Sequence, residues 1–334
     1  MKRREFRVFH RIVIVTFLVF FAISTGQRST SQEQETPVGP RWWPSAWGPD
    51  DQKGALNHIT PTKVVEAKNL IKEGRVYELG RVYEPGMPLS GDRFYSLTIP
   101  GVPTAGPLGA NKLVSNDEMF SGQIGQIGTQ LDGLGHVGVR VGDKDIFYNG
   151  LDLGEFGDSK GLKKLGVENM GPVFTRGVLL DVARVAGVRR LEIGYVITPD
   201  DLQKSLEATG VGDIQPGDVV LIHTGHGDLW MVDNDAYNEG EPGIGMAAAR
   251  WLTDRKVSMI GADTWGIEAV PFDGGPDQIA PVHQWTITRH GIYHLENLNL
   301  SELAADKVYA FALIYIPLPL KGATGSPGSP IAVK

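Results

Sequence analysis

The chain has 334 residues, a formal net charge of −7, 41% hydrophobic and 21% charged residues, which is ordinary for a globular protein of one large or two modest domains. It contains no cysteine, which excludes disulfides, thiolate zinc sites, cysteine nucleophiles and lipid attachment through cysteine. The acidic balance argues against a nucleic-acid partner and favours a small molecule or a protein.

The N-terminus has the residue order of a secretory signal peptide. A basic segment, residues 1–11, precedes an apolar run at 12–23, and small residues follow up to Gly26. The apolar run is short for a membrane span, which needs about 20 residues. We therefore predict a signal peptide at 1–26 and a periplasmic or secreted protein. The alternative is an uncleaved anchor, which would be the only contact with a membrane.

A polar stretch separates this segment from the folded region. We predict that residues 27–40 are a disordered linker and that 41–334 form a single domain. Thr60 is a favourable N-cap and Pro61 suits the first helical position, so a helix is predicted to begin there and to end at Gly74.

The rest of the chain suggests an α/β protein. Short β-like runs occupy 76–99, and the Gly- and Pro-rich segment 100–115 is predicted to be a long surface loop over the site. In the second half, apolar runs alternate with amphipathic ones, which favours an α/β core. The predicted strands are 176–181, 218–225, 257–262 and 308–316, and the predicted helices are 199–208 and 243–255.

Residues 125–136 form a glycine-rich stretch with a suggestive spacing of polar side chains. Gln126, Gln130, Asp132 and His136 occur at offsets of 0, 4, 6 and 10. Gln130 and Asp132 share a face if this stretch is extended. Oxygen ligands next to an imidazole suit a divalent metal and proton transfer. The alternative is a turn whose polar side chains satisfy their own backbone.

Other candidates for chemistry lie in the second half. Single residues of this kind are more often structural, and we keep that alternative for each. His290 and His294 are four apart, as in a helical metal pair, but their neighbours favour a strand, so we interpret both as structural. No serine has the context of a nucleophile elbow. The remaining candidates are His223, His226, Asp263, His283 and Glu296.

Together these segments resemble the metal-dependent cyclase family, which includes bacterial kynurenine formamidases and isatin hydrolases. The resemblance extends from Trp47 to the C-terminus. It implies a swivelling β/β/α fold, a homodimer or homotetramer, and hydrolysis of amide or related acyl bonds with a bound divalent metal. The matching segments are 47–57, 125–136, 217–221 with 224–225, 261–264, 281–283, 296–298 and 322–327.

The family's metal motif, His-x-Gly-Thr-His-x-Asp-x-Pro-x-His, is altered in this chain. Gln126 and Gln130 replace the two leading histidines, and Leu134 replaces the proline. By resemblance, Gln126, Gln130 and Asp132 are the metal ligands and His136 is the general acid/base.

Two further residues and the choice of metal follow from the same resemblance. His283 and Glu296 match positions close to the metal, and we predict His283 as a ligand and Glu296 as a catalytic residue. An amide oxygen is a neutral, weak and hard ligand, so the loss of two imidazoles weakens zinc binding. Manganese is therefore favoured over zinc, with magnesium or calcium as alternatives.

The sequence thus predicts a kynurenine formamidase-like hydrolase of an amide, lactam or lactone bond in a small cyclic or aryl substrate. Activated water would attack the carbonyl, and His136 would take its proton. The alternative is a non-catalytic small-molecule-binding protein with an eroded metal site. Specificity is expected from residues 86–115 and from Trp230, Trp265 and Trp285.

Overall fold

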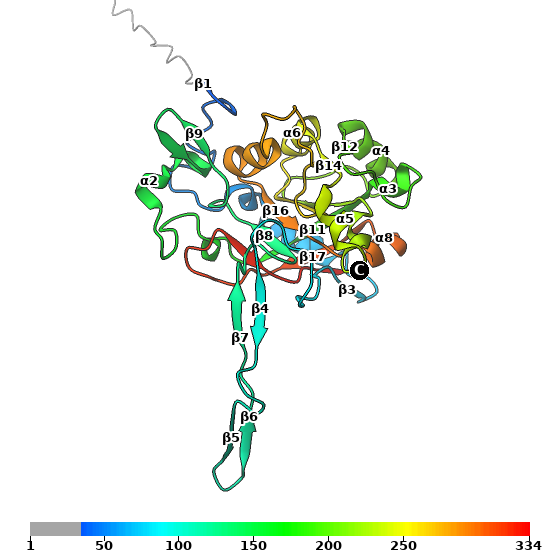
Figure 1. Cartoon of the computed structure of the whole chain (residues 1–334). Coiled ribbons are helices and arrows are strands. Elements are labelled where there is room, and N and C mark those ends of the chain that lie inside the picture. The colour runs from blue at the N-terminus through cyan, green and yellow to red at the C-terminus, as the bar shows by residue number, and fades with distance from the viewer. Residues whose placement is uncertain (1–34) are drawn as a thin grey trace, which may run out of the picture. The chain divides into compact units, whose positions relative to one another are not determined.

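A nine-stranded mixed sheet is the centre of the computed structural model, which describes residues 35–334 (Figure 1). The four central strands are parallel, and the strands toward both edges are antiparallel. The predicted α/β class is therefore confirmed, whereas the predicted signal peptide lies outside the described residues. In order across the sheet, the strands are β18 (Gly325–Pro327), β8 (Gln130–Asp132), β16 (Tyr293–Glu296), β15 (Met259–Ala262), β13 (Val219–His223), β11 (Val173–Asp181), β17 (Ala310–Tyr315), β19 (Ile331–Val333) and β3 (Val76–Glu78).

The central strands are almost continuously aliphatic because both of their faces are covered. In β11 and β13, Val178 and Val220 face one core, and Leu179 and Leu221 face the other. The first face is covered by helices α3 (Val182–Val185), α4 (Pro199–Thr209) and α6 (Met246–Asp254).

Helix α4 has the ends that the sequence predicts. The Thr198 hydroxyl accepts a hydrogen bond from the backbone N–H of Asp201 at 3.3 Å, and Pro199 occupies the first helical position. Gly210 ends the helix with a φ of +69°, a conformation that glycine adopts without strain. The amphipathic segment therefore packs Leu202 and Leu206 against the sheet.

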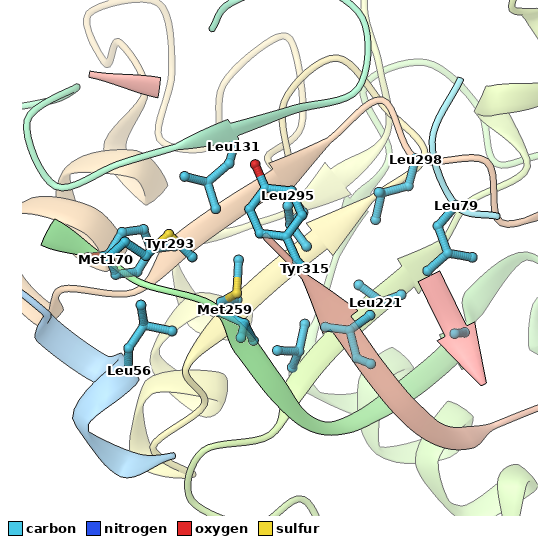
Figure 2. Close-up of a cluster of buried hydrophobic side chains, with 14 of the residues drawn as sticks. Leu56, Leu79, Leu131, Met170, Leu221, Met259, Tyr293, Leu295, Leu298 and Tyr315 are labelled. Atoms are coloured by element: carbon cyan, nitrogen blue, oxygen red, sulfur yellow. The ribbon is translucent and has the colours of Figure 1, made fainter. Parts of the chain in front are cut away.

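The second core lies on the other face of the sheet (Figure 2). It contains Leu131 of β8 and Tyr77 of β3, which belong to opposite ends of the strand order. Residues from both ends share one cluster, so the sheet curls around it. Leu221, Met259 and others fill its middle (Figure 2).

Short helices and paired strands surround the sheet. No helix within residues 35–334 is long and apolar enough to cross a membrane. The short helices are η1 (Gly54–His58), α1 (Pro61–Lys68), η2 (Tyr148–Gly150), α2 (Leu153–Phe156), η3 (Val167–Asn169), η4 (His226–Leu229), α5 (Asn234–Glu239), α7 (Pro281–His283), the π-helix η5 (Gln284–Arg289) and α8 (Ser301–Ala305). The small sheets pair β1 (Glu35–Thr36) with β2 (Gly39–Pro40), β9 (Val139–Val141) with β10 (Lys144–Ile146), and β12 (Val196–Ile197) with β14 (Gly243–Ile244).

Two predicted boundaries need correction. Residues 35–40, assigned to the linker, form the β1–β2 hairpin, and the Arg289 guanidinium holds it through the carbonyl oxygen of Val38 at 3.2 Å. Helix α1 begins at the predicted Thr60 cap but ends at Lys68, not at Gly74. Ala67 is the last buried residue of this helix, and the apolar residues that follow it, Leu70 and Ile71, are not buried.

Residues 95–122 form a two-stranded arm, so the prediction of a surface loop over the site at 100–115 is wrong. Strands β4 (Tyr95–Thr98) and β7 (Met119–Gly122) pair at its base, and β5 (Ala105–Leu108) and β6 (Leu113–Ser115) pair further out. The arm extends away from the sheet (Figure 1). Cross-strand pairing satisfies the backbone here, although glycines and prolines interrupt the sequence pattern.

Asp218 forms a buried ionic cluster at the start of β13. Its carboxylate is fully removed from water and accepts hydrogen bonds from Arg176 Nε and from the backbone N–H of Gln215 at 2.8 Å. The Lys63 ammonium of α1 contacts the same carboxylate. This residue therefore connects α1, β11 and β13.

We expect Asp218→Asn to lower the free energy of unfolding by about 3–5 kcal/mol, because it leaves two largely buried cations without their counter-charge. Urea or guanidinium unfolding followed by circular dichroism measures the change. Asp200→Asn, in an exposed pair with Lys204, is the control and should change stability by less than about 1 kcal/mol. Equal effects of the two substitutions would contradict this role.

Candidate metal centre

Strands β8 and β16 bring four polar side chains to one face of the sheet. Their antiparallel register pairs Gln130 with Glu296 and Asp132 with His294. Side chains of directly opposite residues lie on the same face. The intervening residues, Leu131 and Leu295, point into the core on the other face (Figure 2). The predicted extended conformation of 130–132 is therefore present, and it forms a compact block of polar groups.

His283 of helix α7 lies against this block. Its Nε2 atom is 3.2 Å from Glu296 Oε1 and 3.9 Å from Asp132 Oδ2. Its Nδ1 atom is hydrogen-bonded to Glu268, which also accepts from the backbone N–H groups of Val282 and His283. A carboxylate at Nδ1 fixes the ring and directs Nε2 toward the other two carboxylates.

The charge state of His283 follows from these contacts. Burial by itself lowers the pKa of this imidazole, but hydrogen bonds to Glu268 and Glu296 and the charges of both carboxylates raise it well above its ordinary value. Without another cation, a proton on His283 therefore balances part of the buried negative charge. A metal ion that binds here displaces that proton.

The two glutamines hold carboxylates in place. The Gln126 Nε2 group donates to Asp132 Oδ1 at 3.0 Å, and the Gln130 Nε2 group donates to Glu296 Oε2 at 2.7 Å. A carboxylate accepts hydrogen bonds, so each amide presents its NH₂ group rather than its oxygen. Gln130 Oε1 has no hydrogen-bond partner and is buried, which makes it available to a cation.

His136 lies on the more accessible side of the centre, in the loop after β8. Its Nε2 atom is 3.4 Å from Asp132 Oδ2, and its side chain is 26% exposed. Burial lowers the pKa of His136, with the nearby positive charges of His283 and Arg93 acting in the same direction and Asp132 against it. The imidazole is therefore neutral at pH 7 and carries a lone pair.

Buried carboxyl groups are concentrated around this centre. Burial and the charge of Asp132 raise the pKa of Glu296 to about 7. Burial raises the pKa of Glu241 well above its usual value, although the backbone N–H groups of Trp265 and Gly266 donate to that carboxylate. The four carboxylates are those of Asp132, Glu241, Glu268 and Glu296.

These residues fit a divalent cation. One ligand atom from each of four residues lies within 4.8 Å of the others: Asp132, His283, His294 and Glu296. Two buried lone-pair atoms of the paired strands β8 and β16, Gln130 Oε1 and His294 Nδ1, have no partner. Carboxylates and imidazoles are ordinary ligands of divalent metals, and the excess of buried negative charge favours their binding.

Comparison with known protein families identifies the family of this chain. The family described as "putative cyclase" matches residues 55–269, more than half of the sequence. The chain belongs to the cyclase family. The resemblance inferred from its motifs is therefore confirmed.

Solved structures have the same fold. A crystal structure described as a novel cyclase is 32% identical, covers 86% of this chain and 96% of that chain, and has a TM-score of 0.77. Isatin hydrolase A from Ralstonia solanacearum is 21% identical over 82% and 97% of the two chains, with a TM-score of 0.57. Isatin hydrolase A from Labrenzia aggregata, bound to benzyl benzoate, is 20% identical over 81% and 97%, with a TM-score of 0.53. A search of curated proteins found no match.

All six residues predicted from the cyclase resemblance lie in one connected network. Asp132, His283 and Glu296 place oxygen or nitrogen atoms at its centre. Gln126 and Gln130, predicted as ligands, donate their NH₂ groups to the carboxylates, and Gln130 Oε1 has no hydrogen-bond partner. His136 lies beside Asp132.

Sequence reasoning missed His294, which it interpreted as structural. The predicted strand is present as β16, but His294 lies opposite Asp132, and its Nδ1 atom is 4.0 Å from Glu296 Oε1. The period of two in a strand is the signal that finds it, because His294 and Glu296 must share a face. His290 is separate and lines a cavity of about 430 Å³ with Trp47.

The remaining candidates have structural contacts. Asp263 accepts hydrogen bonds from the backbone N–H groups of Thr224 and Gly225, so it holds the turn after β13. His223 is paired with Asp181 at 2.8 Å.

Of the three tryptophans expected to shape specificity, Trp265 lies beside the centre. Its backbone N–H binds Glu241, and the Arg93 guanidinium lies 5.7 Å from its ring centroid. Trp230 is largely buried against Tyr237 and Arg81.

Trp285 has no contact with the metal centre. Its ring packs against the guanidinium groups of Arg250 and Arg289, and its Nε1 atom donates to the Thr253 hydroxyl at 3.1 Å.

We expect Glu268→Gln to weaken Mn²⁺ binding by roughly 10–100-fold, because the His283 ring loses the carboxylate that orients it. Isothermal titration calorimetry on metal-free protein measures the dissociation constant. Glu207→Gln, at an exposed position of α4, is the control and should leave it unchanged. A folded Glu268→Gln protein with wild-type affinity would show that the contact is not needed for binding.

Proposed function

We propose that this cyclase-family protein is a divalent-metal-dependent hydrolase that cleaves an amide, lactam or lactone bond of a small cyclic or aryl compound. The observation that carries the proposal is the convergence of Asp132, His283, His294 and Glu296 within 4.8 Å, with His136 on the accessible side. A site that served only packing would not concentrate desolvated carboxylates and imidazoles in this way, because burial of charge is unfavourable.

The structural neighbours support hydrolysis in general terms. Isatin hydrolases are among them, and their fold covers more than 80% of this chain. Their identity to this chain is 20–21%, so the type of bond and the substrate rest on the residues of the centre itself.

The chain's own residues supply positioning and proton transfer. A metal, when bound, polarises a substrate carbonyl and lowers the pKa of water. Asp132 orients His136, whose neutral ring accepts the proton of the attacking water and returns it to the leaving group. Gln126 and Gln130 hold the two carboxylates and thereby preorganise the centre.

The substrate side is defined by Trp265 and its neighbours. A cavity of about 100 Å³ lies beside the centre, lined by Tyr237, Glu241 and Trp265 among others. The flat face of an indole favours stacking with an aryl ring, and the Arg93 guanidinium next to it suits an acidic group on the substrate or product.

Manganese is the metal we propose. Two carboxylates at the centre favour a cation that accepts oxygen ligands readily, and imidazole nitrogen is compatible with manganese as well as with softer metals.

We expect Asp132→Asn to abolish both metal binding and turnover, because the amide that replaces the carboxylate is neutral and a weak ligand. Activity is measured over formamides, lactams and lactones with Mn²⁺ and with chelator, and binding is measured as the thermal shift on adding Mn²⁺. At a free Mn²⁺ concentration 100 times the dissociation constant, the wild-type protein should gain about 2.7 kcal/mol in stability.

Asp158→Asn, at an exposed loop position, is the matched control and should retain both properties. Wild-type protein that binds Mn²⁺ but cleaves none of these compounds would favour the non-catalytic binding protein. Equal activity with chelator and with metal would rule out the metal dependence.

A further inference from the structure

His294 carries a buried nitrogen atom that lacks a partner. The side chain is fully removed from water, and its Nδ1 atom has no hydrogen bond. That atom faces Glu296 Oε1 at 4.0 Å and belongs to the group of four ligand atoms at the centre. Buried polar atoms are nearly always satisfied, and a cation bound at the centre would satisfy this nitrogen.

The hydrogen bonds on the other side of the ring determine its tautomer. The Thr286 hydroxyl of η5 donates to the carbonyl oxygen of Val282 at 2.7 Å, and Thr286 Oγ1 is 2.6 Å from His294 Nε2. A hydroxyl has one proton to donate, so Thr286 must accept from Nε2–H of His294. The lone pair of the neutral ring is therefore on Nδ1 and points to the centre.

The surroundings keep this ring neutral. Burial lowers the pKa of His294 well below its ordinary value, and the positive charge of His283 acts in the same direction. Thr286 thus does for His294 what Glu268 does for His283, although the two rings expose different nitrogen atoms. The Nε2 atom of His283 and the Nδ1 atom of His294 both face Glu296 Oε1, at 3.2 and 4.0 Å.

We propose that His294 is a metal ligand through Nδ1, and that with His283 it gives the centre two imidazole nitrogens and selectivity for transition metals over magnesium and calcium. This inference rests on the proposed function only in that the centre binds a divalent cation. Metal–ligand distances of about 2.0–2.2 Å place ligand atoms roughly 3–4.4 Å from one another. The His283–Glu296, His283–Asp132 and His294–Glu296 contacts of 3.2, 3.9 and 4.0 Å lie in this range. Imidazole nitrogen favours transition metals, whereas magnesium and calcium favour oxygen.

The glutamines are consistent with this ligand set. Gln126 and Gln130 turn their NH₂ groups toward carboxylates, so neither offers nitrogen lone pairs. The nitrogen ligands therefore come from β16 and α7 rather than from the strand that carries Asp132.

Equilibrium binding tests the selectivity. Metal-free wild-type protein is titrated with Co²⁺, Mn²⁺ and Mg²⁺ in competition with a chelator, and we expect Co²⁺ to bind at least roughly 100-fold more tightly than Mg²⁺. His294→Leu should weaken Co²⁺ binding by about 100-fold or more, and Thr286→Val, which removes the positioning hydroxyl, by about tenfold. His290→Gln, outside the centre, is the control and should bind as the wild type does.

Pulsed EPR of Cu²⁺-loaded protein gives a second readout, which counts the coordinated imidazoles directly. Remote ring nitrogens report each coordinated imidazole, and we expect two in the wild type and one in His294→Leu. Metal bound with a single imidazole in the wild type would overturn the role of His294 and leave the proposed hydrolase intact. Absence of any specific metal binding would overturn both.

Discussion

The removal of several carboxylates from water is the constraint on which this site depends. Asp132 and Glu296 are almost fully buried, and a buried carboxylate without compensation costs several kcal/mol. The chain compensates with neutral donors, the amides of Gln126 and Gln130, and with the positive charge of protonated His283. Neutral donors satisfy lone pairs without cancelling charge, and so the centre remains a strong attractor for a cation.

The alternation of side chains along β8 and β16 connects the buried carboxylates to the stability of the fold. Between the polar residues of β8 and β16, Leu131 and Leu295 lock the same two strands into the core on the opposite face (Figure 2). A shift of register by one residue would bury the polar groups among leucines and expose the leucines to the site. The apolar core therefore fixes the distance between Asp132 and Glu296, and the ligand groups are held by rigid strands instead of by loops.

Local signals in the sequence were sufficient to predict the elements that have strong end signals or continuous apolar runs. Thr198, Pro199 and Gly210 define α4 because capping and left-handed backbone are properties of single residues. The arm at 95–122 was not predictable in the same way, since beyond Tyr95 at its base its strands are held by cross-strand pairing. The β1–β2 hairpin likewise depends on Arg289, about 250 residues away in the chain.

The sequence by itself determined which chemical groups were available and that Gln130 and Asp132, two apart in an extended segment, face the same way. It also carried the resemblance to the cyclase family, which predicted that His136, His283 and Glu296 belong to the same site. Only the tertiary structure decided that His294 lies opposite Asp132, and that Thr286 leaves its Nδ1 lone pair free for the centre. Register between strands and the tautomer of an imidazole are set by contacts between distant segments, and no local pattern encodes them.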